Sequence, residues 1–426
     1  MKLTFSVSGT QLRCVEDRTP LGRRHLLPYD PPRVVELSAE LLAVLERANR
    51  ARTLSDANLA NLKLAGEELA RQLIPKDLQS RLRDSMGSLA LTIDEELAPV
   101  PWELLYDGEQ FLCQRFDLGR HLIADWQPNA TVWRPAELRQ PLRMLVICSD
   151  TRGDLERLEQ ECTGLLSTMD AHPDKLSVRL LRAQDLESVR RALKSYDLVH
   201  FAGHADYDPT DPGGAGWHLG DGKLTADEIA TLGMARPMPL LVFSNACQTG
   251  LAGPWDANRR GRVLGLAGAF LLSGSRFYVG TQWELVDGIG AQVATHFYDA
   301  LVRGANVGAA LRAARMRVID DGGEETLGWA GYVLYGDPTY VPLPATGSAQ
   351  KSDGRPGATG RLGIRATLPW KRRITADQVA ERAAALADEA ATPPRTALPP
   401  WMVAGIMVLM LLVAAVLGAW LVSMLR

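Results

Sequence analysis

The sequence lacks an excess of basic residues. Its 47 Lys and Arg residues stand against 50 Asp and Glu residues, and the formal net charge is -3. A protein that holds a phosphate backbone needs a basic surface, so nucleic acid is not an expected partner. No GxxxxGK[ST] motif occurs, and the glycine cluster 213–216 does not lie between a strand and a helix. A phosphate-binding loop is therefore not expected.

Cysteine is scarce in this chain. The cysteines are odd in number and widely spaced, and none forms a CxxC pair: Cys14, Cys113, Cys148, Cys162 and Cys247. This distribution argues against a disulfide framework and against zinc or redox chemistry, and it fits a reducing compartment.

Charge is absent from one long segment, residues 401–425, which consists mainly of Met, Val, Leu, Ala and Gly. At a rise of about 1.5 Å per residue, such a helix spans the roughly 30 Å hydrocarbon core of a bilayer, so we expect one transmembrane helix. Basic residues at 371–373 and Arg395 precede it and only Arg426 follows it, which predicts a body that faces the cytoplasm. Residues 1–6 lack a basic stretch before an apolar core, so we expect no signal peptide.

The chain divides into four expected parts. Residues 1–140 mix strand-like and helical patterns and form an α+β accessory lobe, residues 141–342 form an α/β domain, residues 343–400 form a flexible linker with a short helix, and residues 401–425 form the membrane helix. Within the lobe we expect a strand and two helical stretches: 2–7, 37–45 and 59–82.

The second part alternates between short apolar runs and helical patterns. Such alternation predicts a mainly parallel sheet with flanking crossover helices. The expected strands are 142–148, 176–181, 198–204, 240–247 and 277–280, and the expected helices are 155–169, 186–193, 225–232, 263–272 and 289–301.

Two of these apolar runs each end in one reactive side chain, His204 and Cys247. Open α/β sheets place their chemistry just beyond the carboxyl ends of the strands, so we expect both residues on one rim. A thiol needs a nearby base to become a thiolate, and an imidazole can supply that base and later protonate a leaving amine. The histidine precedes the cysteine by 43 residues, compared with about 50 in caspases. The pattern favours a cysteine protease.

Four segments resemble the CHAT family of caspase-like peptidases, which are relatives of separases. They are Val199-His200-Phe201-Ala202-Gly203-His204, Ser244-Asn245-Ala246-Cys247-Gln248-Thr249-Gly250, Gly280-Thr281-Gln282-Trp283 and Trp329-Ala330-Gly331-Tyr332-Val333-Leu334-Tyr335-Gly336-Asp337-Pro338. The resemblance covers roughly residues 93–338, because Pro101-Trp102-Glu103-Leu104-Leu105 also looks like a segment upstream of such domains. It implies a caspase-like fold for this mainly parallel sheet and its flanking helices.

The resemblance also implies a mechanism. Cys247 is the nucleophile and His204 the general base and acid, through a thioester that water hydrolyses without a metal or cofactor. The oxyanion hole uses the backbone amides of Cys247 and of the residue after the histidine. That residue is Ala205 instead of the usual glycine; its N–H can still donate, and its methyl group could narrow the peptide groove. Asn245 is a smaller departure from the pattern.

Other polar groups have simpler interpretations. On a strand, His200 and His204 lie about 13 Å apart, too far to share a metal ion, so we expect His200 to pack or hydrogen-bond beneath the site. The aspartates at 206, 208, 211 and 221 are expected to form an acidic surface loop rather than a cation site. A buried free cysteine often acts only as a small hydrophobic residue, so the alternative for Cys247 is a purely structural role in the core.

Substrate preference has a weaker signal. Related peptidases often recognise a charged residue before the cut, through groups that follow the first strand and the cysteine region. Asp150, Glu284 and Asp287 occupy comparable places, and all three are acidic. A desolvated guanidinium requires a carboxylate partner, so we expect cleavage after Arg or Lys. The alternative is that these three residues are surface charges.

The sequence as a whole predicts a membrane-anchored cysteine endopeptidase with a cytoplasmic body and a protein substrate. The family resemblance suggests bacterial signalling, defence or cell death. We expect latency, imposed by the lobe, the linker or an activating protein partner. Two rivals stay open: a catalytically silent peptide-binding scaffold at the membrane, and a thiol acyltransferase that shares the nucleophile.

Overall fold

The computed structural model describes most of the first 344 residues. The described ranges are 1–17, 22–51, 56–123, 140–151, 153, 155–182, 185–208, 211–235, 238–246, 265–282 and 288–344. The chain divides into two compact units, Met1–Lys351 and Ser352–Arg426. The expected linker helix and the apolar segment 401–425 lie outside the described residues. Within the described ranges, no helix combines the length and apolar character that a membrane span needs.

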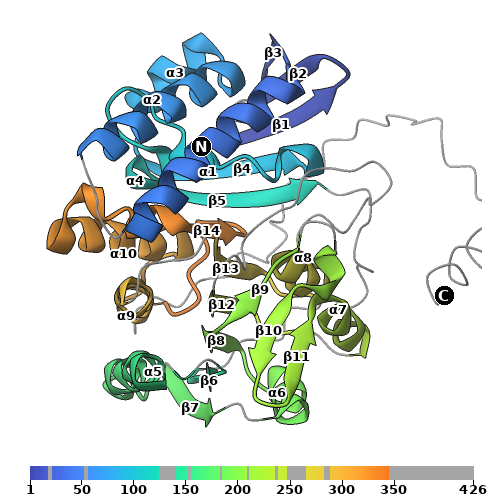
Figure 1. Cartoon of the computed structure of the whole chain (residues 1–426), viewed down its shortest axis with the longest axis vertical. Coiled ribbons are helices and arrows are strands. Elements are labelled where there is room, and N and C mark those ends of the chain that lie inside the picture. Colours follow the sequence, from blue (N-terminus) through green and yellow to red (C-terminus); the bar gives the residue numbers. More distant parts are fainter. Residues whose placement is uncertain are drawn as a thin grey trace, which may run out of the picture. The chain divides into compact units, whose positions relative to one another are not determined.

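A sheet of 11 strands forms the centre of the described structure (Figure 1). Its order is β3-β2-β1-β4-β5-β14-β13-β12-β8-β6-β7. The strands are β1 (Lys2–Ser8), β2 (Gln11–Glu16), β3 (Arg23–Pro28), β4 (Gly87–Asp94), β5 (Phe116–Ile123), β6 (Leu142–Ser149), β7 (Leu176–Arg182), β8 (Leu198–Gly203), β12 (Leu241–Asn245), β13 (Phe277–Thr281) and β14 (Tyr332–Tyr335).

The carboxyl-terminal half of this sheet confirms the expected mainly parallel α/β arrangement. Strands β7, β6, β8, β12 and β13 run parallel to one another, and β14 is antiparallel to β13. Each predicted strand and helix of this half is present, with its described bounds within about three residues of the expected ones. The helices are α5 (Leu155–Asp170), α6 (Leu186–Leu193), α7 (Ala226–Ala235), α8 (Gly265–Leu272), α9 (Ile289–Val302) and α10 (Val307–Gly322).

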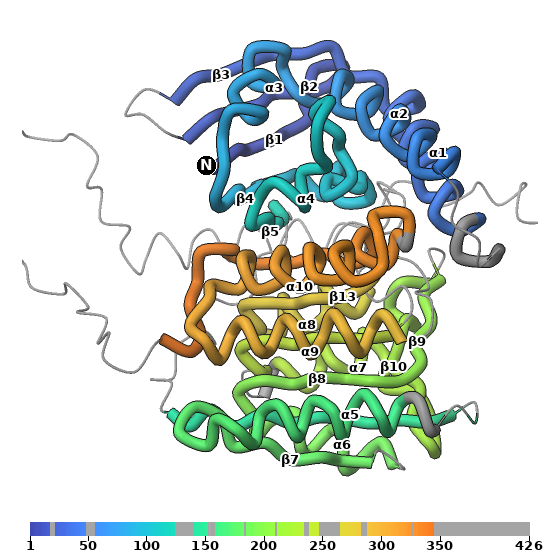
Figure 2. The backbone as a smooth tube through the Cα atoms, turned by 90° about the vertical axis from the view of Figure 1, so that its left-hand side faces the viewer, coloured from blue at the N-terminus to red at the C-terminus, as the bar shows by residue number. Residues whose placement is uncertain are grey.

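Helices cover both faces of these strands. Figures 1 and 2 show α5, α9 and α10 on one face and α6, α7 and α8 on the other. Because side chains alternate along a strand, neighbouring residues of β8 enter different cores. Leu198 and Ala202 join one buried cluster, whereas Val199 and Phe201 join the other. This double burial is why the strands appear in the sequence as continuous apolar runs.

A small antiparallel sheet lies beyond β8. Its order is β11-β10-β9, formed by β9 (Ala205–Asp206), β10 (Gly216–Leu219) and β11 (Gly222–Thr225). Its first strand begins one residue after His204, so the sheet is attached directly to the end of the histidine strand.

The amino-terminal residues continue the large sheet. They contribute β1 to β5 together with α1 (Pro31–Ala51), α2 (Asp56–Leu73), α3 (Lys76–Arg83) and α4 (Leu112–Arg115). Pro75 precedes α3 and separates it from α2, so the helical stretch expected over 59–82 is two helices. The two halves meet where β5 pairs with β14, at Arg120 and Tyr335. The expected division at residue 140 therefore separates two halves of one sheet.

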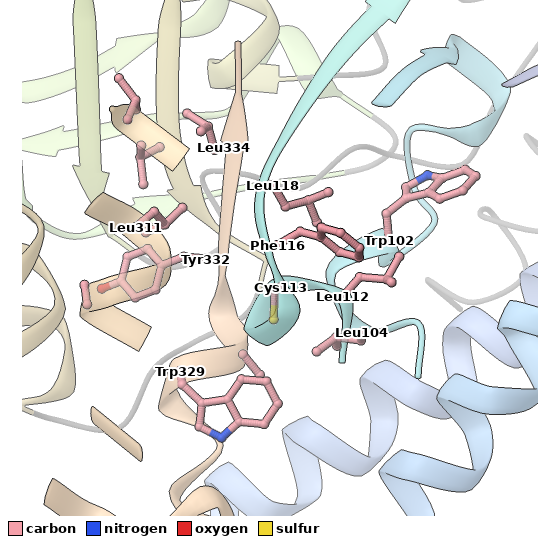
Figure 3. Close-up of a cluster of buried hydrophobic side chains, with 14 of the residues drawn as sticks. Trp102, Leu104, Leu112, Cys113, Phe116, Leu118, Leu311, Trp329, Tyr332 and Leu334 are labelled. Carbon is pink, nitrogen blue, oxygen red and sulfur yellow. The ribbon is translucent and has the colours of Figure 1, made fainter. Parts of the chain in front are cut away.

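An apolar cluster fills this junction (Figure 3). Figure 3 shows Phe116 and Leu118 on one side of the neighbouring strands β5 and β14 and Leu334 on the other, with Trp329 below Cys113. The ring centroids of Phe111 and Trp329 are 5.2 Å apart. The segment resembling an upstream family motif contributes Glu103, whose buried carboxylate pairs with the buried guanidinium of Arg120. The two halves thus share one core.

Candidate active site

The register of two neighbouring strands builds the rim of the site. β8 and β12 are parallel and adjacent, and Ala202 lies opposite Asn245. His204 follows Ala202 by two residues, and Cys247 follows Asn245 by two residues in the sequence. Cys247 itself lies outside the described residues. Adjacent strands are about 4.8 Å apart, so this register directs the chain toward one end of the sheet at both positions.

His204 is half-buried in the connection between β8 and β9. Its carbonyl oxygen accepts a hydrogen bond from the backbone N–H of His218 at 2.8 Å. The Ser149 hydroxyl, at the end of β6, donates to the His218 carbonyl at 2.8 Å. A Cβ atom at position 203 would lie 2.8 Å from the Ser149 carbonyl oxygen, so glycine is required for this close approach. The backbone around His204 is therefore held from two sides.

The direction of the Ala205 N–H follows from the small sheet. In an antiparallel ladder, hydrogen-bonded residue pairs alternate with pairs that are not hydrogen-bonded. Since His218 donates to His204, these two residues form a hydrogen-bonded pair. The next pair, Ala205 and Trp217, is therefore one that is not hydrogen-bonded. The Ala205 N–H therefore points away from β10. Its methyl group packs into a buried apolar cluster, so it does not project into open space.

Trp217 connects the small sheet to both rim strands. Its indole Nε1–H donates to the Ser244 hydroxyl of β12 at 2.8 Å. Its ring stacks on Phe201 of β8, with centroids 4.3 Å apart and planes 2° from parallel. All of these side chains are buried. The fixed indole holds β10 against the two strands that precede His204 and Cys247.

A buried polar cluster lies beneath the rim. Asn245 Nδ2 donates to Glu161 Oε1 at 2.6 Å, and His200 Nε2 lies 2.9 Å from the same oxygen. The Tyr332 hydroxyl donates to Asn245 Oδ1 at 2.7 Å. Because Nδ1 of His200 has no hydrogen-bond partner within the described part of the chain, the arrangement assigns the ring proton to Nε2. His200 thus hydrogen-bonds under the site, as the sequence predicted.

The residue before the cysteine is also held. Ala246 is buried, and its carbonyl oxygen accepts a hydrogen bond from the Thr281 hydroxyl at 2.7 Å. Sequence reasoning did not single out Thr281, Glu161 or Tyr332 as site residues. Thr281 and Tyr332 do stand in segments that resemble the family, whereas Glu161 carries no signal beyond its place in a helical pattern.

The expected acidic pocket is described only in part. Asp150 follows β6, half-buried and next in the chain to Ser149, which lies opposite Gly203. Its Oδ1 accepts a hydrogen bond from Gly153 N–H at 2.7 Å. Asp150 therefore flanks the His204 strand end. Glu284 and Asp287 lie outside the described residues.

The acidic loop near the site has local partners. Asp206 pairs with Lys223 at 3.1 Å and with His218 at 3.3 Å. Asp211 accepts from Gly214 N–H, and Asp221 accepts from the N–H of Leu186 at the start of α6. Among the described residues, no group of three or more His, Cys, Asp or Glu side chains is arranged to hold a metal ion.

The four described cysteines are buried and unpaired by disulfides. Burial raises the pKa of the Cys14 and Cys113 thiols to about 12. A hydrogen bond from Cys162 lowers the pKa of Cys148, and the same contact raises the pKa of Cys162. Cys14 and Cys113 are therefore protonated at neutral pH and poor nucleophiles.

The family model of the CHAT domain matches residues 63–337. This is more than half of the chain, so the protein belongs to the CHAT-domain family, which is cysteine-peptidase-like. A comparison with curated proteins finds no match. The match begins within α2, and so includes β4 and β5 but not β1, β2 and β3.

Comparison with solved structures bears on the fold. Separase from Saccharomyces cerevisiae, in complex with securin, is similar with a TM-score of 0.50 at 13% identity, over 79% of this chain and 30% of that chain. The present chain thus spans less than a third of that separase. A secreted C11 cysteine protease from Bacteroides thetaiotaomicron, bound to an irreversible peptide inhibitor, gives a TM-score of 0.31 at 10% identity, over 45% of this chain and 65% of that chain. The separase similarity shows the caspase-like fold.

Proposed function

We propose that this protein is a cysteine endopeptidase in which His204 and Cys247 form the catalytic dyad. The observation that carries the proposal is the register of β8 and β12, which pairs Ala202 with Asn245 two residues before each reactive side chain. Membership of a cysteine-peptidase-like family supports it. The backbone of His204 is held by a hydrogen bond from His218, which is itself held by Ser149, so the position of the imidazole is restrained.

The proposed reaction has two stages. His204 takes the proton of the Cys247 thiol, and the thiolate attacks the carbonyl carbon of the scissile peptide bond. The imidazolium then gives its proton to the leaving amine, and a thioester remains on Cys247. Water, deprotonated by His204, hydrolyses the thioester and restores the thiol.

Two backbone amides would stabilise the negative oxygen of each tetrahedral intermediate: those of Ala205 and Cys247. The Ala205 N–H points away from β10 and so is not used by the small sheet. An alanine at this position keeps the donor, and its methyl group is already accommodated in the core. The departure from glycine is therefore compatible with catalysis.

We further propose a substrate with Arg or Lys before the cut. Asp150 lies at the end of β6, the neighbour of β8, and would supply one carboxylate; Glu284 and Asp287 would supply the others. Asp150→Asn is a sharp variant, because an amide oxygen can still accept from Gly153 N–H while the charge is lost. We expect the ratio of kcat/KM for substrates with Arg or Lys before the cut to kcat/KM for substrates with a neutral residue there to fall about tenfold in this variant.

The substrate is proposed to be a protein at a membrane, since residues 401–425 contain no charge and exceed the length of a bilayer span. An activating protein partner would release the enzyme from latency.

In the full chain, Leu412→Arg combined with Leu417→Arg should abolish flotation with phospholipid vesicles, whereas Leu412→Val combined with Leu417→Val should not. Equal flotation of both variants would contradict the anchor.

The activity itself is tested with the purified full chain in detergent. A peptide library is digested by the wild type, by Cys247→Ala and by His204→Ala, and the products are identified by mass spectrometry. We expect cleavage after Arg or Lys by the wild type only, once cell extract is added as a source of activators to release it from latency. Cleavage that survives in Cys247→Ala would refute the dyad. Binding of peptides without cleavage, in the presence of cell extract as a source of activators, would instead identify a peptide-binding scaffold.

A further inference from the structure

The last residue of β13 contacts the peptide that leads into the proposed nucleophile. The Thr281 side chain is buried, and its hydroxyl donates to the Ala246 carbonyl oxygen at 2.7 Å. β12 and β13 pair from Leu241 and Phe277 to Phe243 and Val279. Thr281 lies two residues beyond the last of these pairs, so its side chain continues the connection between the two strands at the rim.

The geometry of the peptide bond gives this contact a consequence. In a trans peptide the C=O and the following N–H point in opposite directions within one plane. A hydrogen bond that fixes the Ala246 carbonyl therefore restrains the plane of the peptide group that contains this carbonyl and the following N–H. The same bond polarises the peptide group and makes that N–H a better donor.

We propose that Thr281 is a positioning residue for the oxyanion hole: it holds the peptide between residues 246 and 247 so that the Cys247 N–H faces the developing negative oxygen. This inference rests on the proposed function. Donors to an oxyanion act through being oriented before the reaction, so a small rotation of this peptide weakens the stabilisation of the transition state.

Thr281 is itself held by the neighbouring strand. It lies opposite Tyr332 in the antiparallel pair of β13 and β14, and Gln282 N–H donates to the Gly331 carbonyl at 2.8 Å. Threonine is branched at Cβ, which restricts its side-chain torsion. Tyr332 in turn donates to Asn245, the residue before Ala246. Two consecutive residues ahead of Cys247 are thus fixed by side chains from β13 and β14.

The test separates positioning from a purely structural role by comparing two reactions of the same thiol. Peptide hydrolysis develops an oxyanion, whereas alkylation by iodoacetamide displaces iodide without one. A peptide aldehyde that matches the cleavage preference provides a third readout, because its adduct with the thiol places an oxygen in the oxyanion position. Each is measured in the full chain, with Cys247→Ala as the background for alkylation of other thiols.

We expect Thr281→Val to lower kcat/KM about 30-fold and to raise the inhibition constant of the aldehyde in parallel. This is less than the roughly 100- to 1,000-fold known for complete loss of one oxyanion donor, because the donor is misoriented and not removed. The alkylation rate of Cys247 should stay within about twofold, because the thiolate is not altered. Thr281→Ser retains the hydroxyl and should recover most of the activity. Thr281→Ala replaces Thr281→Val if circular dichroism shows that the valine variant is unfolded.

The matched control is Thr168→Val on α5, which removes a threonine hydroxyl bonded to the Gly164 carbonyl at 2.9 Å, away from the rim. It should leave all three readouts unchanged. Wild-type kcat/KM in the Thr281 variants, or an equal fall in hydrolysis and alkylation, would overturn the positioning role. If the wild type itself fails to hydrolyse any peptide, the proposed function fails, and the Thr281 inference fails with it.

Discussion

Asn245 and Glu161 are joined by a hydrogen bond of 2.6 Å, from the amide of the first to the carboxylate of the second. The two residues lie on β12 and α5, and the bond ties the end of the cysteine strand to a covering helix. The same carboxylate oxygen accepts from His200 on β8, four residues before His204. The buried Glu161 carboxylate thus accepts hydrogen bonds from both of the strands that lead to the proposed catalytic residues.

Loss of this acid should destabilise the fold. Glu161→Ala leaves the Asn245 amide and the His200 N–H without their common acceptor, and we expect a loss of about 3 kcal/mol in the free energy of unfolding. Glu159→Ala is the matched control on the same helix, since Glu159 makes an exposed ion pair with Arg182 and should cost less than about 1 kcal/mol. Urea denaturation of the full chain measures both. An equal loss of unfolding free energy in both variants would contradict a stabilising role for the hydrogen bonds of Glu161.

Two buried tyrosines offer a second comparison. Tyr332 donates to Asn245 at 2.7 Å, whereas the Tyr298 hydroxyl has no hydrogen-bond partner among the described residues. Tyr332→Phe should cost about 1 kcal/mol, because the Asn245 oxygen loses its donor. Tyr298→Phe should be neutral or stabilising, because an unpaired buried hydroxyl is removed. Thermal unfolding would contradict this if the two variants shifted the midpoint by the same amount.

The sequence was informative about the strands and poor in predicting polar contacts between them. Parallel strands with helices on both faces are buried twice, so β8 and β12 appear as apolar runs that end at His204 and Cys247. The cluster of Glu161, Asn245 and Tyr332 was not predicted, because its members are far apart in the chain and meet only through tertiary packing. A lone glutamate on a helix usually faces solvent.

The relation between the two halves of the sheet was not predicted either. The apolar junction depends on one register pair, Arg120 with Tyr335, which joins strands separated by more than two hundred residues. Local patterns carry no information on such a pairing. They gave one strand and two helical stretches of the lobe, but not β2 to β5, and the fusion of its strands with the caspase-like sheet emerges only in three dimensions.

The buried ion pair at this junction should behave asymmetrically on mutation. Arg120 and Glu103 are both fully enclosed, and Arg120 also donates to the Ala98 carbonyl at 3.2 Å. Arg120→Met should cost about 3 to 5 kcal/mol, because a buried carboxylate is left unpaired. Combining it with Glu103→Leu should restore much of the loss. Denaturant unfolding of the two variants measures this difference.

The matched control for the ion pair is Arg143→Met, at an exposed pair with Asp197 on the same sheet. It should cost less than about 1 kcal/mol. The prediction fails if the double variant at 103 and 120 is as unstable as Arg120→Met alone, because the burial of an uncompensated charge would then not be the cause.

The shared sheet predicts that the carboxyl-terminal half does not fold alone. A fragment of residues 141–344 would expose the edge of β14 that pairs with β5, and the ring of Trp329, which packs on Phe111. Unpaired edges and exposed apolar surface favour aggregation. We expect this fragment to be aggregated or to unfold without cooperativity, whereas a fragment of residues 1–344 should be monomeric and unfold in one transition. Size-exclusion chromatography and urea titration measure both properties. A monomeric, cooperative 141–344 fragment would mean that β5 contributes little to the stability of β14.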